Sequence, residues 1–187
     1  MKTLHLLRHA KSSWDDPMLD DVERPLTQRG ISDCQLMAPV LMDIGCCFTH
    51  IYCSSATRAK QTLKRIGEHQ FEPGMGSVIS AERLADTHIE KDLYTFQRSE
   101  LMQFCQALPE RVDEITLVGH NPAFTELHNF LSTDNIEHLP TCSYVRIDCM
   151  TGAWQNLYAG CGKTQYFITP KMLKQGREIR SFNSLDS

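Results

Sequence analysis

Leu4-His5-Leu6-Leu7-Arg8-His9 is a short apolar run that ends in a cation and an imidazole. Such a run is typical of a strand covered on both faces, so we expect a buried first strand over 2–7. Arg8 and His9 at its carboxyl end are costly to bury and well placed to act, because ligands of open α/β sheets bind at that edge. They are therefore the first candidate functional residues.

Length and composition predict the class of protein. The 187 residues, 41% of them hydrophobic, predict one domain over 1–187, with a solvated C-terminal tail from about 171. The net charge of −4 argues against general nucleic-acid binding. No signal peptide and no run long enough to span a membrane are evident, so we expect a cytoplasmic protein with no membrane partner. The cysteines form no C-x-x-C pair and are expected to be free, small core residues.

Short apolar runs alternate with longer amphipathic segments along the chain, and this alternation predicts an α/β fold. The further strands are expected at 48–53, 77–84, 115–118, 144–150, 154–159 and 165–168, and the helices at 28–45, 55–69, 99–108 and 123–131. The segment 82–95 is expected to be irregular. A hairpin through Thr151-Gly152 is expected to join the strands 144–150 and 154–159.

Capping residues predict where the helices begin. The expected caps are Thr27, Ser54 or Ser55, Ser99, and Asn121 with Pro122 at the first helical position. Pro39 lies inside the first helix, where its missing N–H group predicts a kink or a break.

Candidate functional residues follow three of the predicted strands. Arg8 and His9 end the first strand, Arg58 lies in the first turn after the second, and His120 follows 115–118. If these strands are parallel, as helix crossovers favour, the four side chains meet at one edge of the sheet. Helix N-termini add partial positive charge at that edge. The sequence therefore predicts an anion site, and phosphate is the natural anion.

Each of these residues also has an ordinary structural explanation. Arg8-His9 could be a surface dipeptide, Arg58 a partner in a helix-surface ion pair, and His120 a core hydrogen-bonding group. A metal site is the other common use of histidines. His5 and His9, however, would lie about 13 Å apart along a strand, too far to share one ion. The other histidines show no ligand spacing, so we expect neither a metal nor a cofactor.

Four segments, in this order, resemble motifs of the histidine phosphatase superfamily. They are Leu7-Arg8-His9-Ala10-Lys11-Ser12-Ser13-Trp14, Arg24-Pro25-Leu26-Thr27-Gln28-Arg29-Gly30, Ser54-Ser55-Ala56-Thr57-Arg58-Ala59 and Val118-Gly119-His120-Asn121-Pro122. Their spacing, and the ending Phe167-Ile168-Thr169-Pro170, resemble the small phosphohistidine phosphatase branch in particular.

The resemblance implies a three-layer α/β/α sandwich around a mixed, mostly parallel sheet, as in phosphoglycerate mutase-like proteins. It also implies that His9 is a nucleophile that becomes phosphorylated, with Arg8, Arg58 and His120 around the phosphoryl group. The implied partner is a protein that carries phosphohistidine. A phosphatase or mutase of small phosphorylated metabolites, and a phosphate-binding adaptor without turnover, remain alternatives. No metal is needed where arginines supply the positive charge.

The sequence departs from the family pattern at two places. Ala10 follows the Arg-His pair, where many members carry Gly, and no Glu-rich motif supplies a clear general acid after the third strand. Glu82, Asp86, Glu90 and Asp15 are candidate acids only. Imidazole is a far weaker base than an alkoxide and leaves more easily, so the missing acid predicts a preference for phosphoramidates over phosphoesters.

Overall fold

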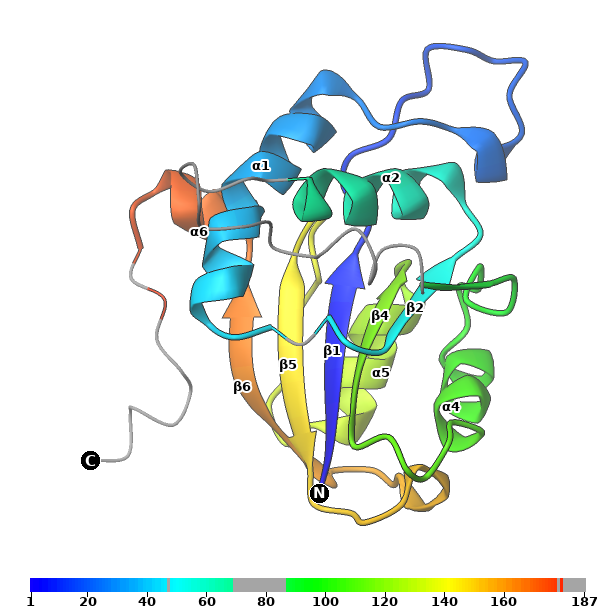
Figure 1. Ribbon diagram of the computed structural model, residues 1–187, viewed down its shortest axis with the longest axis vertical. Coiled ribbons are helices and arrows are strands. Elements are labelled where there is room, and N and C mark those ends of the chain that lie inside the picture. The colour runs from blue at the N-terminus through cyan, green and yellow to red at the C-terminus, as the bar shows by residue number, and fades with distance from the viewer. Residues whose placement is uncertain (47, 69–86, 178, 180–187) are drawn as a thin grey trace.

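A six-stranded sheet, in the order β3-β2-β4-β1-β5-β6, forms the centre of the molecule. The computed structural model describes residues 1–46, 48–68, 87–177 and 179. The strands are β1 (Lys2–Arg8), β2 (Ile51–Ser54), β3 (His88–Glu90), β4 (Glu114–Gly119), β5 (Tyr144–Cys149) and β6 (Gly162–Ile168) (Figure 1).

The sheet is mixed and mostly parallel, as predicted. β1 pairs in parallel with β4, and β2 pairs in parallel with both β3 and β4, whereas β5 runs antiparallel to β1 and β6. Arg8 is opposite Gly119, and Cys53 is opposite Val118. The segments that follow β1, β2 and β4 therefore begin at the same level of one sheet edge.

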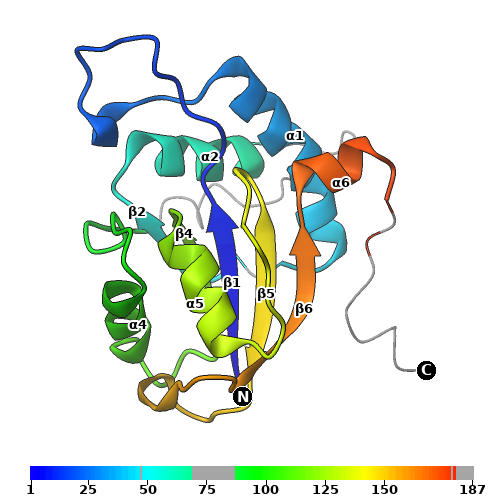
Figure 2. The ribbon, with the colours of Figure 1, turned by 180° about the vertical axis from the view of Figure 1, so that it is seen from behind.

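Helices cover both faces of the sheet, which confirms the three-layer architecture (Figures 1 and 2). One face carries α1 (Gln28–Asp43), α2 (Thr57–Gly67) and α6 (Pro170–Lys174), and the other carries α4 (Arg98–Gln106) and α5 (Ala123–Leu131). Leu6 and Leu7 are both fully buried, but they belong to separate cores on opposite faces. Neighbouring residues of a strand point to opposite faces, so β1 is buried on both faces from Lys2 to Leu7.

The segment after β5 differs from the prediction. Residues 154–159 do not form a strand. Trp154–Asn156 form a short 3-10 helix, η2, and the next strand along the chain to pair with β5 is β6. Trp154 is fully buried, and its indole N–H donates to the Val112 carbonyl at 2.7 Å. The aromatic ring fills the core instead of a position in the sheet. The hairpin predicted at Thr151-Gly152 is consequently wrong, because the chain turns back only before Gly162.

The start of α1 agrees with the prediction. Thr27 Oγ1 accepts a hydrogen bond from the Gly30 N–H group at 3.0 Å, which confirms the cap. The helix does not break at Pro39 but continues to Asp43.

The other predicted caps are displaced. α2 begins at Thr57 after a cap at Ala56, and Ser99 lies inside α4. Pro122 takes the cap position of α5 that was expected for Asn121. In each of these three helices, the N-cap is a different residue from the one predicted.

Two boundary predictions also change. β3 lies within the segment 82–95, which was expected to be irregular; the strand expected at 77–84 lies outside the described residues. The C-terminal tail was expected to begin at about 171, but residues 171–174 belong to α6. Lys174 Nζ of this helix donates to the buried carboxylate of Asp33 on α1. The described cysteines are free. In the part of the chain that the structure describes, no helix is long and apolar enough to cross a bilayer.

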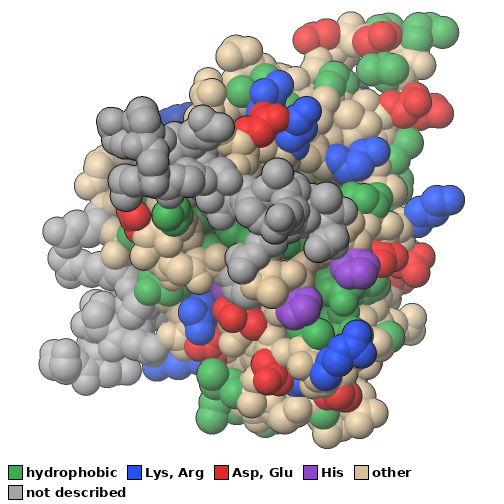
Figure 3. All heavy atoms as spheres, in the orientation of Figure 1, with side chains coloured by type: hydrophobic (Ala, Val, Ile, Leu, Met, Phe, Trp, Pro, Cys, Tyr) green, Lys and Arg blue, Asp and Glu red, His purple; other side chains and the backbone are tan. Residues whose placement is uncertain are grey.

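Residues 11–25 form a loop that stands out from the body of the molecule (Figure 1). Apolar and acidic side chains alternate on it (Figure 3), with Trp14 71% and Met18 88% exposed. The loop ends in η1 (Asp21–Glu23), a short 3-10 helix that contacts α2. Through this contact, the end of the loop lies against α2, near the sheet edge where β1 ends.

Candidate active site

The four predicted side chains lie together at the carboxyl edge of the parallel strands. The His9 N–H group donates to the Gly119 carbonyl at 3.1 Å, and the rings of His9 and His120 have centroids 4.9 Å apart. Arg58 is 2% exposed in the first turn of α2, and Arg8 ends β1. Arg8 and Arg58 both act electrostatically on the two imidazoles. The predicted convergence of the four residues is confirmed, while their catalytic roles stay predictions.

His9 is held in one tautomer. Its Nδ1 donates to the Ala10 carbonyl at 2.8 Å, so the lone pair is on Nε2. Burial lowers the pKa of His9 to about 3; the Ala10 hydrogen bond acts in the opposite direction, and Arg58 and Arg8 lower it further. His9 is therefore neutral at physiological pH, and neutral imidazole is the nucleophilic form.

His120 is bound to a residue that was predicted only as a possible helix cap. Its Nε2 lies 2.7 Å from Ser54 Oγ. Burial is the largest cause that lowers the pKa of His120 to about 2, and the neighbouring His9 and Arg58 lower it further. The Tyr94 ring packs edge-on against His120, with centroids 5.4 Å apart. The imidazole is thus neutral, oriented and largely shielded from water.

Asp21 is a site residue that sequence reasoning missed. Its Oδ2 accepts from Arg58 Nη2 at 2.9 Å and from the Tyr94 hydroxyl at 2.5 Å, and its Oδ1 accepts from Arg24 Nε at 2.9 Å. Burial raises the pKa of Asp21, but hydrogen bonds from Tyr94 and Arg58 outweigh it and lower the pKa to about 2. Arg58 therefore forms an ion pair, but its partner is Asp21 on the loop 11–25 and not a residue on the surface of α2. The only signal for this residue in the sequence was that the loop 11–25 is rich in acidic residues.

Thr62 ties the nucleophile segment to α2. Its Oγ1 accepts from the Ala10 N–H group at 2.8 Å and donates to the Arg58 carbonyl at 2.7 Å. The backbone beside His9 and the backbone of Arg58 are consequently fixed through one hydroxyl group.

Arg8 is held on one side only. Its Nη1 donates to the Leu139 carbonyl at 2.7 Å and lies 3.2 Å from His138 Nε2. Burial, and then the charge of Arg58, lowers the pKa of Arg8 to about 10. Two guanidinium groups that destabilise each other's charge favour an anion between them.

Three buried polar atoms of the site have no hydrogen-bond partner among the described residues: Arg8 Nε, Arg58 Nε and His120 Nδ1. A buried N–H group without an acceptor costs about 1–3 kcal/mol. An oxyanion bound beside His9 would supply acceptor oxygens to both arginines. The arrangement can therefore bind a tetrahedral anion and present it to His9 Nε2.

The candidate acids are placed as follows. Glu90 ends β3, which is parallel to β2, so it lies at the sheet edge of the site; Asp15 is exposed on the loop 11–25. Glu82 and Asp86 lie outside the described residues. In the described ranges, no three His, Cys, Asp or Glu side chains are grouped so that they could hold a metal ion.

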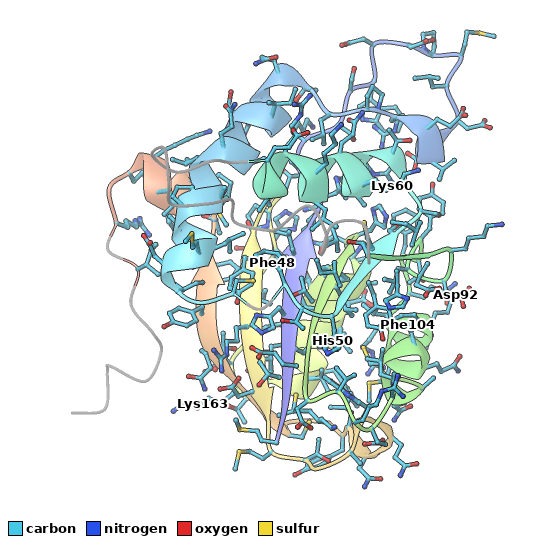
Figure 4. All side chains as sticks on the ribbon, viewed as in Figure 1. Phe48, His50, Lys60, Asp92, Phe104 and Lys163 are labelled. Atoms are coloured by element: carbon cyan, nitrogen blue, oxygen red, sulfur yellow. The ribbon has the colours of Figure 1, made fainter. Side chains whose placement is uncertain are left out.

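Tyr94 lines a cavity of about 550 Å³. The same residue contacts both Asp21 and His120, so it connects the cavity to the site. Asp92 and Phe104, labelled in Figure 4, line it from the segment after β3 and from α4. The cavity provides open space beside the anion site on the α4 side of the molecule.

Residues 4–91 match the model of the histidine phosphatase superfamily (branch 1). Over this segment the chain is similar to the histidine phosphatase superfamily. The matched segment holds Arg8, His9 and Arg58, and His120 follows in the C-terminal half. An uncharacterised chloroplastic protein of Arabidopsis thaliana is 28% identical over 170 residues, 86% of this chain and 72% of the relative. An uncharacterised protein of Mycobacterium tuberculosis is 27% identical over 175 residues, 88% of this chain and 100% of the relative.

Solved structures of the superfamily have the same fold. The protein histidine phosphatase SixA complexed with tungstate superposes with a TM-score of 0.69 at 21% identity, over 91% of this chain and 99% of the other. An α-ribazole phosphatase from Shigella flexneri gives a TM-score of 0.57 at 18% identity, over 81% and 92%. At such low identity these neighbours establish the architecture and leave the substrate open.

Proposed function

We propose that this protein is a phosphatase that transfers a phosphoryl group to His9 and then hydrolyses it, with phosphohistidine in a protein as the substrate. The observation that carries the proposal is the state of His9. Its Nδ1 donates to the Ala10 carbonyl, so that Nε2 carries a lone pair beside the buried guanidinium group of Arg58 and the half-buried one of Arg8. A phosphate-binding adaptor would not require this nucleophile.

The proposed reaction has two displacements. The Nε2 lone pair of His9 forms a bond to phosphorus while the bond from phosphorus to the leaving atom breaks, and the leaving atom takes that electron pair. Water then attacks phosphorus, the pair of the P–N bond returns to Nε2, inorganic phosphate leaves and a proton goes to solvent. Arg8 and Arg58 stabilise the charge on the equatorial oxygens in both steps, because planar guanidinium groups match those oxygens in geometry and charge.

Phosphohistidine is favoured over a phosphoester by the chemistry of the leaving group. Imidazole departs as a weak base, whereas an alkoxide needs a positioned acid. The structure describes two of the candidate acids. Asp15 is exposed. Glu90 lies at the end of β3, and the described hydrogen bonds of the His9 and His120 side chains go to Ala10 and Ser54 instead. A structural neighbour that is a protein histidine phosphatase with bound tungstate, a tetrahedral oxyanion, supports the same choice.

Hydrolysis assays test the proposal. Purified protein is compared on a phosphohistidine-containing protein, phosphoramidate, sugar phosphates and alkyl phosphates, with His9→Ala as the control. We expect turnover of the P–N substrates, retention of ³²P on wild-type protein in rapid acid-free quenching, and neither with His9→Ala. Comparable kcat/KM values for P–N substrates and alkyl phosphates would contradict the assigned substrate. Wild-type protein that binds phosphate and turns over none of these substrates would contradict the enzymatic function.

A further inference from the structure

His138 is a residue of the site that neither the family motifs nor the predicted catalytic set includes. It lies on the connection between α5 and β5, is exposed, and reaches Arg8 with its Nε2 at 3.2 Å from Nη1. The same short segment supplies the Leu139 carbonyl to Arg8 at 2.7 Å. Two consecutive residues thus hold one nitrogen of the guanidinium group.

The direction of the His138 hydrogen bond follows from its partner. Arginine has five N–H donors and no acceptor, so Nε2 of His138 must accept. Nε2 then carries no proton, and on the other side of the ring Asn121 Nδ2 lies 3.4 Å from Nδ1. A lysine, an arginine or a protonated histidine at this position would offer only donors and a second positive charge to Arg8.

Counting hydrogens shows which side of Arg8 remains for a ligand. Nη1 carries two hydrogens, and the Leu139 carbonyl and His138 Nε2 provide an acceptor for each. The opposite edge of the guanidinium group consists of Nε and Nη2, and Nε is buried without a partner among the described residues. That edge is the one able to grip two oxygens of an anion side by side.

The segment that carries His138 is itself fixed. Asn121 Nδ2 donates to the Leu139 carbonyl at 3.0 Å and to Thr125 Oγ1 at 2.8 Å, and Thr125 Oγ1 also accepts from the Leu139 N–H group at 3.0 Å. Asn121 directly follows His120 at the end of β4. The same strand end therefore carries one site histidine and fixes the Leu139 segment that contacts Arg8.

We propose that His138 is a positioning residue, which holds the guanidinium group of Arg8 so that its Nε–Nη2 edge faces the phosphoryl group. The inference rests on the proposed phosphatase function. A single acceptor at Leu139 leaves the guanidinium plane free to rotate about one hydrogen bond, and the second acceptor at His138 fixes the plane. Small displacements of a clamping group have large kinetic effects, since a misplacement of about 1 Å can cost on the order of 100-fold in rate.

The experiment compares His138→Leu, which removes the acceptor, with His138→Gln, whose Oε1 can accept from Arg8. Glu137→Gln on the neighbouring exposed residue is the matched control. The measurements are kcat and KM for phosphoramidate hydrolysis and the dissociation constant of tungstate by calorimetry. We expect His138→Leu to lower kcat/KM and to weaken tungstate binding about tenfold, the size of a lost hydrogen bond to a charged group. We expect His138→Gln to recover most of both losses, and Glu137→Gln to stay within twofold of wild type.

Two results would overturn the inference. One is a His138→Leu protein that stays within twofold of wild type in both kcat/KM and tungstate affinity. The other is a His138→Gln protein as impaired as His138→Leu, since a merely structural loss is not restored by an acceptor. The tungstate measurement separates this test from the proposed function. If wild-type protein turned over no phosphoramidate, the phosphatase proposal would fail, and tungstate affinity would still report whether His138 orients Arg8.

Discussion

Arg58 is buried almost completely in the first turn of α2, and Asp21 engages both of its terminal nitrogens from the loop side. Its Nε is buried without a partner among the described residues. We expect Arg58→Ala to lower phosphatase turnover more than 100-fold, because it removes a preorganised donor from the transition state. Arg65→Ala, on the exposed end of the same helix, is the control. A loss of less than threefold in steady-state assays would place Arg58 outside the site.

Ser54 is a second residue whose part in the site depends on a partner far along the chain. Its Oγ lies 2.7 Å from His120 Nε2 and also accepts from the Ala56 N–H group at 3.3 Å. We expect Ser54→Ala to lower kcat about tenfold, because His120 loses the contact that fixes its ring plane. The neighbouring variant Ser55→Ala is expected to keep wild-type kcat. Equal kcat values for the two variants would refute this role.

At the scale of elements, α1 packs directly on the segment that follows the nucleophile. A Cβ atom at Gly30 would collide with the backbone carbonyl of Lys11, and the same carbonyl accepts from the Thr27 N–H group at 2.9 Å. We expect Gly30→Ala to reduce the free energy of unfolding by about 1–3 kcal/mol, the usual cost of an overpacked contact. Gly152→Ala, where the added methyl group meets open space, is the control.

Urea unfolding curves of both variants check this prediction. A Gly30→Ala protein as stable as Gly152→Ala would show that Lys11 and its neighbours move away at no cost. A displaced Lys11 segment would also shift His9, so we expect kcat of Gly30→Ala to fall along with stability.

At the scale of the whole molecule, the buried histidines link stability to pH. Burial lowers the pKa of His9 to about 3 and that of His120 to about 2, whereas both imidazoles titrate near 6.5 in the unfolded chain. Below pH 6.5 the unfolded state therefore binds more protons, and stability falls as pH falls. The contribution is full above about pH 6.5 and is lost progressively toward the folded pKa values. Each histidine contributes a slope of at most about 1.4 kcal/mol per pH unit.

Urea unfolding at pH 7, 6 and 5 tests this linkage. We expect the stability of wild-type protein to decline over this range and that of His120→Gln to decline less steeply. Asp21 acts in the same direction in a lower window, because its pKa of about 2 lies below its usual value. Parallel pH profiles for the two proteins would show that His120 is protonated to the same extent in the folded and unfolded states.

Local patterns in the sequence determined much of the fold and the first part of the site. The two-sided apolar run of β1, the Thr27 cap and the positions of Arg8, His9, Arg58 and His120 at strand ends can all be read from neighbouring residues. Periodicity and spacing encode these features, because a strand's faces and the common edge of parallel strands are properties of short segments and their order. The wrong strand at 154–159 marks the limit of that information, since a buried tryptophan suits a core position as well as a strand.

Only the tertiary structure decided what each functional side chain binds. Asp21 on Arg58, Ser54 on His120 and His138 on Arg8 join residues that are 37, 66 and 130 positions apart in the sequence. No local rule predicts such pairs, because they arise from the packing of a loop, a strand end and a crossover segment around one sheet edge. The sequence by itself determined the four chemical groups of the site; the fold decided their tautomers, their protonation states and the edges they present to a ligand.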